Sequence, residues 1–265
     1  MTLTLVPIDH GELCHGWTWN INDEDMLAER VARIVLGQYR HVAKILSGAG
    51  VPGPVANTEQ ANAAIKQLTL AEGDDPWHRD GWLFQAISWI AAHQQPSASL
   101  TRMPHIRKAD KGFDGIQLEL NEAGTAVIAV VVFEDKATDK ARDTIRDDVW
   151  PGIVALEKGE RLNELSQEVS GMLDARAAAD PEFDLDTAIA NTLWHNARRY
   201  RVSITIGNTH NNADARAKLF KGFDNSAPGP ASRRRADTIY LPEMRNWMAS
   251  FAACVILKIK AIANV

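Results

Sequence analysis

An α/β fold is predicted by three features of the sequence. Apolar residues recur at helical spacing after Asp23 and again after Pro76. An alternating run over residues 116–120 is followed by a valine-rich run over 126–133, and residues 200–206 alternate again. Helical segments separated by short strand-like runs are typical of mixed α/β proteins. We therefore expect a sheet covered by helices.

The length and composition are those of one compact globular unit. The chain has 265 residues, of which 45% are hydrophobic and 24% are charged, and these fractions are ordinary for a soluble protein. We divide it into a mainly helical region over residues 1–75 and a core region over residues 76–265. Its 2 cysteines are too few for a disulfide framework. The longest nearly uncharged apolar run, over residues 247–257, is shorter than the roughly 20 residues of a membrane span, so a cytoplasmic protein without membrane contact is expected.

The charge balance limits the classes of partner. The chain carries 29 Lys and Arg against 34 Asp and Glu, a formal net charge of −5. This argues against a polybasic nucleic-acid binder. It leaves open an enzyme that acts on nucleic acid through local basic patches.

The first helices are marked by their start signals. Acidic residues at 23–25 precede an apolar pattern that extends to Leu46, and acids are favoured at a helix N-terminus. Asn57 is a plausible cap for a short helix over 58–70. Asp75 and Pro76 look like the cap and first residue of a helix that carries Trp82 and Trp89.

The middle of the chain predicts a β-hairpin. Residues 116–120 alternate between apolar and polar side chains, the turn residues Asn121 to Gly124 follow, and residues 126–133 are then apolar throughout. An uninterrupted apolar run of this length is typical of a strand buried on both faces. A helical stretch follows from Thr138 to about residue 179, with an interruption at residues 150–151.

The last third predicts further elements in alternation. Asp184 or Asp186 caps a helix, residues 200–206 form a strand, and a helix follows over 212–220. Residues 224–235 are expected to be a mobile loop, and residues 238–241 a short strand. Pro242 starts a final amphipathic helix.

The hairpin brings three chemically active side chains to one place. In a hairpin that turns near residues 121–124, paired residue numbers sum to about 246–248, so Asp114 falls opposite residue 132 or 134. Glu134 and Lys136 share one face of their strand, because side chains alternate with a period of two. Asp135 faces the other way, and we expect it at the surface or at a helix cap.

An aspartate, a glutamate and a lysine at one strand end suit phosphodiester hydrolysis. Two neighbouring carboxylates stay ionised together most readily around a cation, and oxygen ligands suit Mg²⁺ or Mn²⁺. We predict that Asp114 and Glu134 hold the ion. Lys136 would orient or deprotonate a water molecule, or neutralise the charge that builds on phosphorus. In the alternative interpretation, the same residues form an exposed ion pair at a hairpin end, which contributes little to stability.

These residues resemble the motif of the PD-(D/E)XK nuclease superfamily. Asp114 matches the aspartate, Glu134 the acid and Lys136 the lysine of that pattern. The resemblance implies a restriction-endonuclease-like α-β-β-β-α-β core with a helical N-terminal region and a C-terminal helix. It also implies a polar group from the preceding helix, and Gln85 is the matching position. The sequence departs from the pattern at Phe113, where many members have a proline.

A second resemblance concerns partners. The segment from Gly112 to Lys140 and the closing residues 239–242 look like the effector nuclease of Hachiman-type bacterial defence systems, which implies a helicase or ATPase partner. DNA is the expected substrate, and basic residues before the motif are candidates for its backbone: Arg107, Lys108 and Lys111. Three interpretations stay open for the arginine triplet at 233–235: it contacts nucleic acid, it contacts a protein partner, or it does neither. A non-catalytic subunit on a nuclease scaffold is the alternative function.

Overall fold

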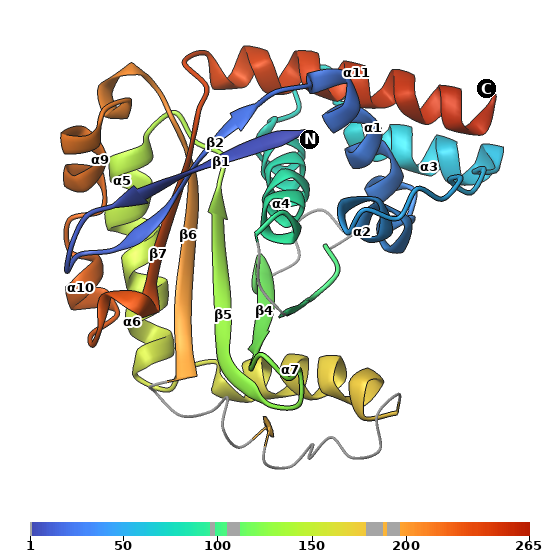
Figure 1. The fold of residues 1–265 in the computed structure, drawn as a ribbon. Helices are drawn as coiled ribbons and strands as arrows, with labels where there is room; N and C mark the ends of the chain where they lie inside the picture. The colour runs from blue at the N-terminus through green and yellow to red at the C-terminus, as the bar shows by residue number, and fades with distance from the viewer. Residues whose placement is uncertain (1, 96–98, 105–111, 179–187, 190–196) are drawn as a thin grey trace.

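A seven-stranded mixed sheet organises the computed structural model, which describes residues 2–95, 99–104, 112–178, 188–189 and 197–265 (Figure 1). Three neighbouring strand pairs in the middle of the sheet are parallel: β5–β6, β6–β7 and β7–β2. The pairs toward the two edges are antiparallel: β1–β2, β3–β4 and β4–β5. The predicted α/β class is confirmed. In spatial order the strands are β1 (Leu3–Asp9), β2 (His15–Ile21), β7 (Arg234–Tyr240), β6 (Arg198–Ile206), β5 (Val127–Lys136), β4 (Gly115–Leu120) and β3 (Ser99–Thr101).

Helices cover both faces of the sheet, and each face has its own hydrophobic core. One layer packs on Trp19 and Ile239 and comprises α1 (Glu24–Val35), α2 (Tyr39–Leu46), α3 (Thr58–Leu68), α4 (Trp77–His93) and α11 (Met244–Ala263). The other packs on Ile116, Val132 and Ile204 and comprises α5 (Ala141–Thr144), the π-helix η1 (Ile145–Val149), α6 (Trp150–Glu157), α7 (Leu162–Ala177), α9 (Ala213–Leu219) and α10 (Phe223–Ser226). Short 3-10 turns lie at Asn208–His210 and Ala231–Arg233.

The N-terminal region contains the predicted helices and a hairpin that was not predicted. Asp23 caps α1 by accepting a hydrogen bond from the backbone N–H of Met26 at 2.8 Å. Asn57 and Gln60 form a reciprocal capping box at α3, a known helix start. The apolar pattern over 23–46 is broken at Gly37, whose φ of 78° lies in the left-handed region that glycine tolerates. Strands β1 and β2 extend the sheet beside β7, although Pro7 and Gly16 interrupt the strand-like pattern there.

The central hairpin forms as predicted. Its strands are β4 and β5, and the pairs Gly115–Phe133 and Ile116–Val132 lie at the upper limit of the predicted register. Residues 129–133 are all buried, because helices lie on both faces of β5. The predicted strand over 200–206 and the helix over 212–220 are also present, as β6 and α9. The helix expected after Asp184 or Asp186 falls mostly outside the described residues.

The prediction of a mobile loop over 224–235 was wrong. This segment contains α10, a 3-10 turn and the first residues of β7. Arg233 and Arg234 are buried, and Arg234 donates hydrogen bonds to the carbonyls of Leu13 and Ala227. The two arginines therefore bridge loops within the fold, where they satisfy buried backbone acceptors, and they do not form a nucleic-acid surface.

Helix α11 passes a length and composition test for a membrane span. This is weak evidence, because a core helix of a soluble protein passes the same test. Its buried residues, among them Met248, Phe251 and Val255, belong to the core that α1 and α4 share. We therefore interpret α11 as a helix that covers the sheet and its neighbouring helices.

Gly115, at the start of β4, makes a close approach that predicts a stability effect. A Cβ atom placed on Gly115 would lie 2.5 Å from the Cδ2 atom of Phe133, whose ring is buried among other side chains. Gly115→Ala should therefore lower the free energy of unfolding by roughly 1–3 kcal/mol through overpacking. Urea unfolding would measure it, with Gly152→Ala as the control, because a Cβ atom there meets nothing within 4 Å. Equal stability of the two variants would contradict the prediction.

Candidate active site

Four predicted residues come together where β4 begins and β5 ends. Asp114 immediately precedes β4, and continuing the hairpin register places it beside Glu134. Its Oδ2 accepts a hydrogen bond from the backbone N–H of Asp135 at 2.8 Å. Its Oδ1 accepts one from the Nε2 of Gln85, on α4, at 2.6 Å. The carboxylate of Asp114 is therefore fixed from two sides, by the sheet and by the helix that covers it.

Lys136 lies between two carboxylates. Its Nζ is 3.4 Å from Oε2 of Glu134 and 3.1 Å from Oδ2 of Asp148. Asp148 is a third acidic residue of this site that the sequence analysis missed. It lies in the π-helix η1, and π-helical turns inside longer helices are frequent at functional sites. The irregular turn has no simple sequence signature, because the apolar periodicity continues through Ile145 and Val149.

The surroundings of the site raise the pKa of both Glu134 and Lys136. Burial raises the pKa of Glu134 to about 7, with the charge of Asp114 adding to the rise and that of Lys136 opposing it. Burial alone would lower the pKa of Lys136, but the carboxylates of Glu134, Asp114 and Asp148 outweigh it and hold that pKa above its usual range. The neighbouring carboxylates therefore favour the protonated, positively charged form of Lys136.

A second cation lies near the acids. The guanidinium of Arg161 sits 4.3 Å from the centre of the Phe113 ring. Its pKa is raised by a hydrogen bond to Glu164 and, in smaller part, by the charges of Glu134 and Asp114. Arg161 could not be selected from the sequence, because it is more than twenty residues from the motif and reaches it only through the packing of α7.

Asp135 was predicted at the surface or at a helix cap, and this was wrong. Its side chain is buried on the face of β5 opposite Glu134, with its Oδ1 3.5 Å from Nη2 of Arg201. Nε of Arg201 is 3.8 Å from Oδ2 of Asp237 on β7. The guanidinium lies 3.6 Å from the centre of the Phe133 ring. A buried ionic cluster of Asp135, Arg201 and Asp237 therefore supports the strand end that carries Glu134 and Lys136.

The donor atoms of the site suit a hard cation with few protein ligands. The part of the chain that the structure describes contains no group of three or more His, Cys, Asp and Glu side chains that could hold a metal ion. Mg²⁺ commonly takes one or two carboxylates and keeps several waters, and Asp114 and Glu134 provide such a pair. The basic candidates Arg107, Lys108 and Lys111 lie outside the described residues.

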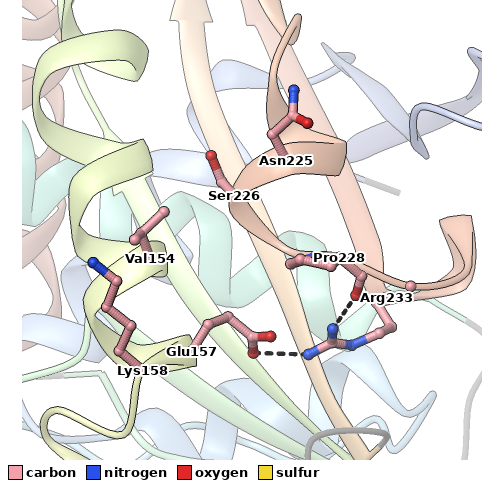
Figure 2. A pocket seen from close by; sticks show the side chains of 8 residues that line it. Val154, Glu157, Lys158, Asn225, Ser226, Pro228 and Arg233 are labelled. Atoms are coloured by element: carbon pink, nitrogen blue, oxygen red, sulfur yellow. Dashed lines mark hydrogen bonds and ion pairs between the residues drawn. The ribbon is translucent and has the colours of Figure 1, made fainter.

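A cavity of about 480 Å³ lies elsewhere, between α6 and α10. Figure 2 shows the Glu157 carboxylate facing Arg233 across it, at 2.8 Å. Glu157 also accepts a hydrogen bond from the hydroxyl of Tyr200, and Arg233 donates to the carbonyl of Pro228. These polar groups satisfy one another, so we assign them to the stability of the fold.

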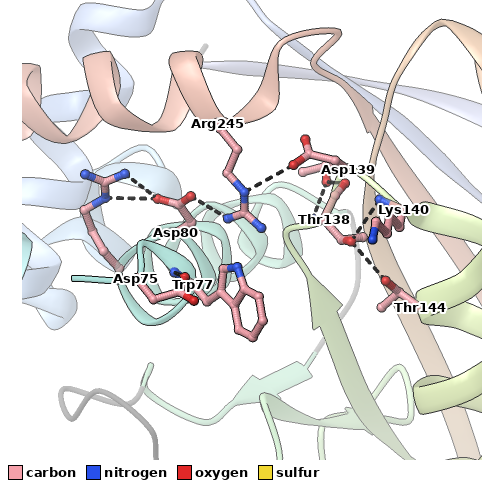
Figure 3. Close-up of polar contacts among 10 residues, drawn as sticks. Asp75, Trp77, Asp80, Thr138, Asp139, Lys140, Thr144 and Arg245 are labelled. Atoms are coloured by element: carbon pink, nitrogen blue, oxygen red, sulfur yellow. Dashed lines mark hydrogen bonds and ion pairs between the residues drawn. The ribbon is translucent and has the colours of Figure 1, made fainter. Parts of the chain in front are cut away.

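Polar contacts also join α4, α11 and the segment after β5 on the side of the site. Arg245 donates a hydrogen bond to Asp80 at 2.6 Å and another to Asp139 at 3.3 Å (Figure 3). Asp80 also accepts from Arg79. This bridge fixes the first turns of α4 against the chain that leaves Lys136.

No family model and no curated protein sequence matches the chain. The case for a function therefore depends on the geometry and chemistry of the site.

Proposed function

We propose that the protein is a metal-dependent nuclease that hydrolyses DNA phosphodiester bonds. The observation that carries this proposal is that Asp114, Glu134 and Lys136 lie together at one end of the β4–β5 hairpin. Gln85 also donates a hydrogen bond to Asp114. Asp114 and Glu134 would hold Mg²⁺ or Mn²⁺. When bound, the ion would supply Lewis acidity that polarises the scissile phosphodiester.

The chain's own residues have separate roles in this proposal. Gln85 and the N–H of Asp135 fix the orientation of the Asp114 carboxylate, as residues that support a metal ligand commonly do. Lys136 stabilises the negative charge that grows on the phosphate, because its neighbours keep it protonated. Asp148 forms a second ion pair with the ammonium group, at 3.1 Å.

The order of elements also supports the proposal. From α4 the chain continues through β3, β4 and β5, then through α5 to α7, and returns in β6 parallel to β5. This order agrees with the restriction-endonuclease-like core that the PD-(D/E)XK resemblance implies. The helicase or ATPase partner and the role in anti-phage defence stay predictions from the second resemblance, and copurification from the native host would test them.

Plasmid cleavage tests the proposed activity. With Mg²⁺ or Mn²⁺, the native protein should convert supercoiled plasmid to nicked or linear forms, and Glu134→Ala should lower the rate by at least about 100-fold. Glu122→Ala is the matched control, since Glu122 is an exposed glutamate in the turn of the same hairpin. Equal cleavage by native protein and Glu134→Ala contradicts the proposal. No cleavage by any form, together with no Mg²⁺ or Mn²⁺ binding by calorimetry, favours the non-catalytic scaffold.

A further inference from the structure

Helix α4 is almost wholly buried, apart from one face. Within Trp77–His93 the residues that are not buried are Trp77, His78, Gly81, Gln85 and His93. Trp77, Gly81 and Gln85 are spaced four residues apart, so they follow one face of the helix. Gln85 is the residue that donates to Asp114. The open face of α4 therefore leads directly into the candidate active site.

Trp77 is a large apolar side chain placed in solvent at the far end of this face. Its side chain is 68% exposed, which is unusual for a tryptophan. Figure 3 shows the indole ring projecting from the start of α4, which the Asp80–Arg245–Asp139 bridge ties to the segment after β5. The backbone N–H of Trp77 donates to Asp75 at 3.1 Å. These polar contacts hold the start of α4 in place, whereas the indole ring of Trp77 is not packed into the core.

Gly81 keeps the path between Trp77 and Gln85 open. A Cβ atom placed there would meet nothing within 4 Å. Glycine in a helix interior costs about 1 kcal/mol relative to alanine, so packing gives no reason for it. The distance along the helix axis from Trp77 to Gln85 is roughly 12 Å at 1.5 Å per residue.

We propose that the open face of α4 binds an unpaired nucleic-acid strand that leads away from the active site, with a base stacked on the Trp77 ring. The inference rests on the proposed nuclease function and names the form of its substrate. An unpaired strand is favoured over a duplex because the π-faces of its bases are accessible to an aromatic side chain. Every base has such a face, so Trp77 contributes affinity without sequence preference.

Binding of a fluorescent oligothymidine of about 12 nucleotides, measured in EDTA so that no cleavage occurs, tests the inference. Trp77→Leu should weaken binding roughly 10-fold, within the range for loss of one stacked base, whereas Trp77→Phe should retain most of the affinity. The dependence of binding on salt should be unchanged, because no charge is removed. Leu257→Ala, a change at another exposed apolar side chain, is the matched control and should have no effect.

Gly81→Leu is the second variant, and it leaves Trp77 in place. Because the position is open, it should fold normally and should also weaken binding of the oligothymidine, while binding to a blunt duplex stays unchanged. Unchanged oligothymidine binding by both Trp77→Leu and Gly81→Leu overturns the inference. If that happens while Glu134→Ala still loses plasmid cleavage, the nuclease proposal stands alone. If both variants weaken binding but the native protein, given Mg²⁺ or Mn²⁺, cleaves neither plasmid nor single-stranded DNA, the strand-binding face stands and the catalytic proposal fails.

Discussion

Lys136→Met should lower the rate of DNA cleavage by roughly 10²- to 10³-fold, the cost of removing one group that stabilises charge in a transition state. Methionine retains most of the apolar chain of lysine and removes only the ammonium group. That group lies 3.4 Å from Glu134 and 3.1 Å from Asp148, and its neighbours keep it protonated. The loss should fall on kcat more than on KM, because the interaction strengthens as negative charge grows on the phosphate.

Lys140→Met is the matched control for this measurement. Lys140 is exposed and lies four residues further along the chain, beyond the end of β5. The two variants make the same change in net charge, so any general effect on DNA attraction is shared. Equal rates for Lys136→Met and Lys140→Met would contradict the assigned role of Lys136. If both variants lose the same fraction of the cleavage rate, and low salt restores their activity, the loss comes from weaker long-range attraction of DNA instead.

The hairpin and its catalytic candidates could be predicted because their signals are local. The alternation over 116–120, the turn residues and the apolar run over 126–133 fix both the strands and their register. Once the register is fixed, Asp114 and Glu134 must be neighbours. Gln85 was placed only by resemblance to a family, and its hydrogen bond to Asp114 depends on how α4 packs against the sheet.

The residues that were missed depend on contacts between distant segments. Asp148 reaches Lys136 because a π-helical turn interrupts the helix after β5. Asp135 follows the predicted alternation, yet it is buried because α4 covers that face of the strand and Arg201 of the neighbouring strand β6 lies beside it. Arg233 and Arg234 form a charged run in the sequence that looks like a loop. Their hydrogen bonds to carbonyls across the chain become apparent only in the folded protein.

Arg201→Met should destabilise the protein by roughly 3–5 kcal/mol, the cost of removing one partner from a buried ion pair. Arg201 is fully buried, and it lies between Asp135 on β5 and Asp237 on β7. It is the positive group of a cluster that contains two carboxylates. Without it, both carboxylates would be left in the core without this counter-charge. Arg40→Met, at an exposed arginine, should change the free energy of unfolding by less than about 0.5 kcal/mol.

The pH dependence of this loss separates charge from packing. Burial raises the pKa of Asp135 to about 6 and also raises that of Asp237, while Arg201 opposes both shifts. Because the folded state binds more protons than the unfolded state between pH of about 4 and 6, these acids make stability fall as pH rises through that window. Removing Arg201 raises both pKa values further. The loss in Arg201→Met should therefore be larger at pH of about 8 than at pH of about 5.

Urea unfolding of native protein and Arg201→Met at the two pH values measures this difference directly. Methionine fills much of the arginine's volume, so lost packing against Phe133 would cost the same amount at both pH values. A loss that is equal at the two pH values would therefore contradict a charged cluster and assign the effect to packing alone. A loss that grows with pH supports a buried cluster whose charge balance holds the end of β5, and with it Glu134 and Lys136, in place.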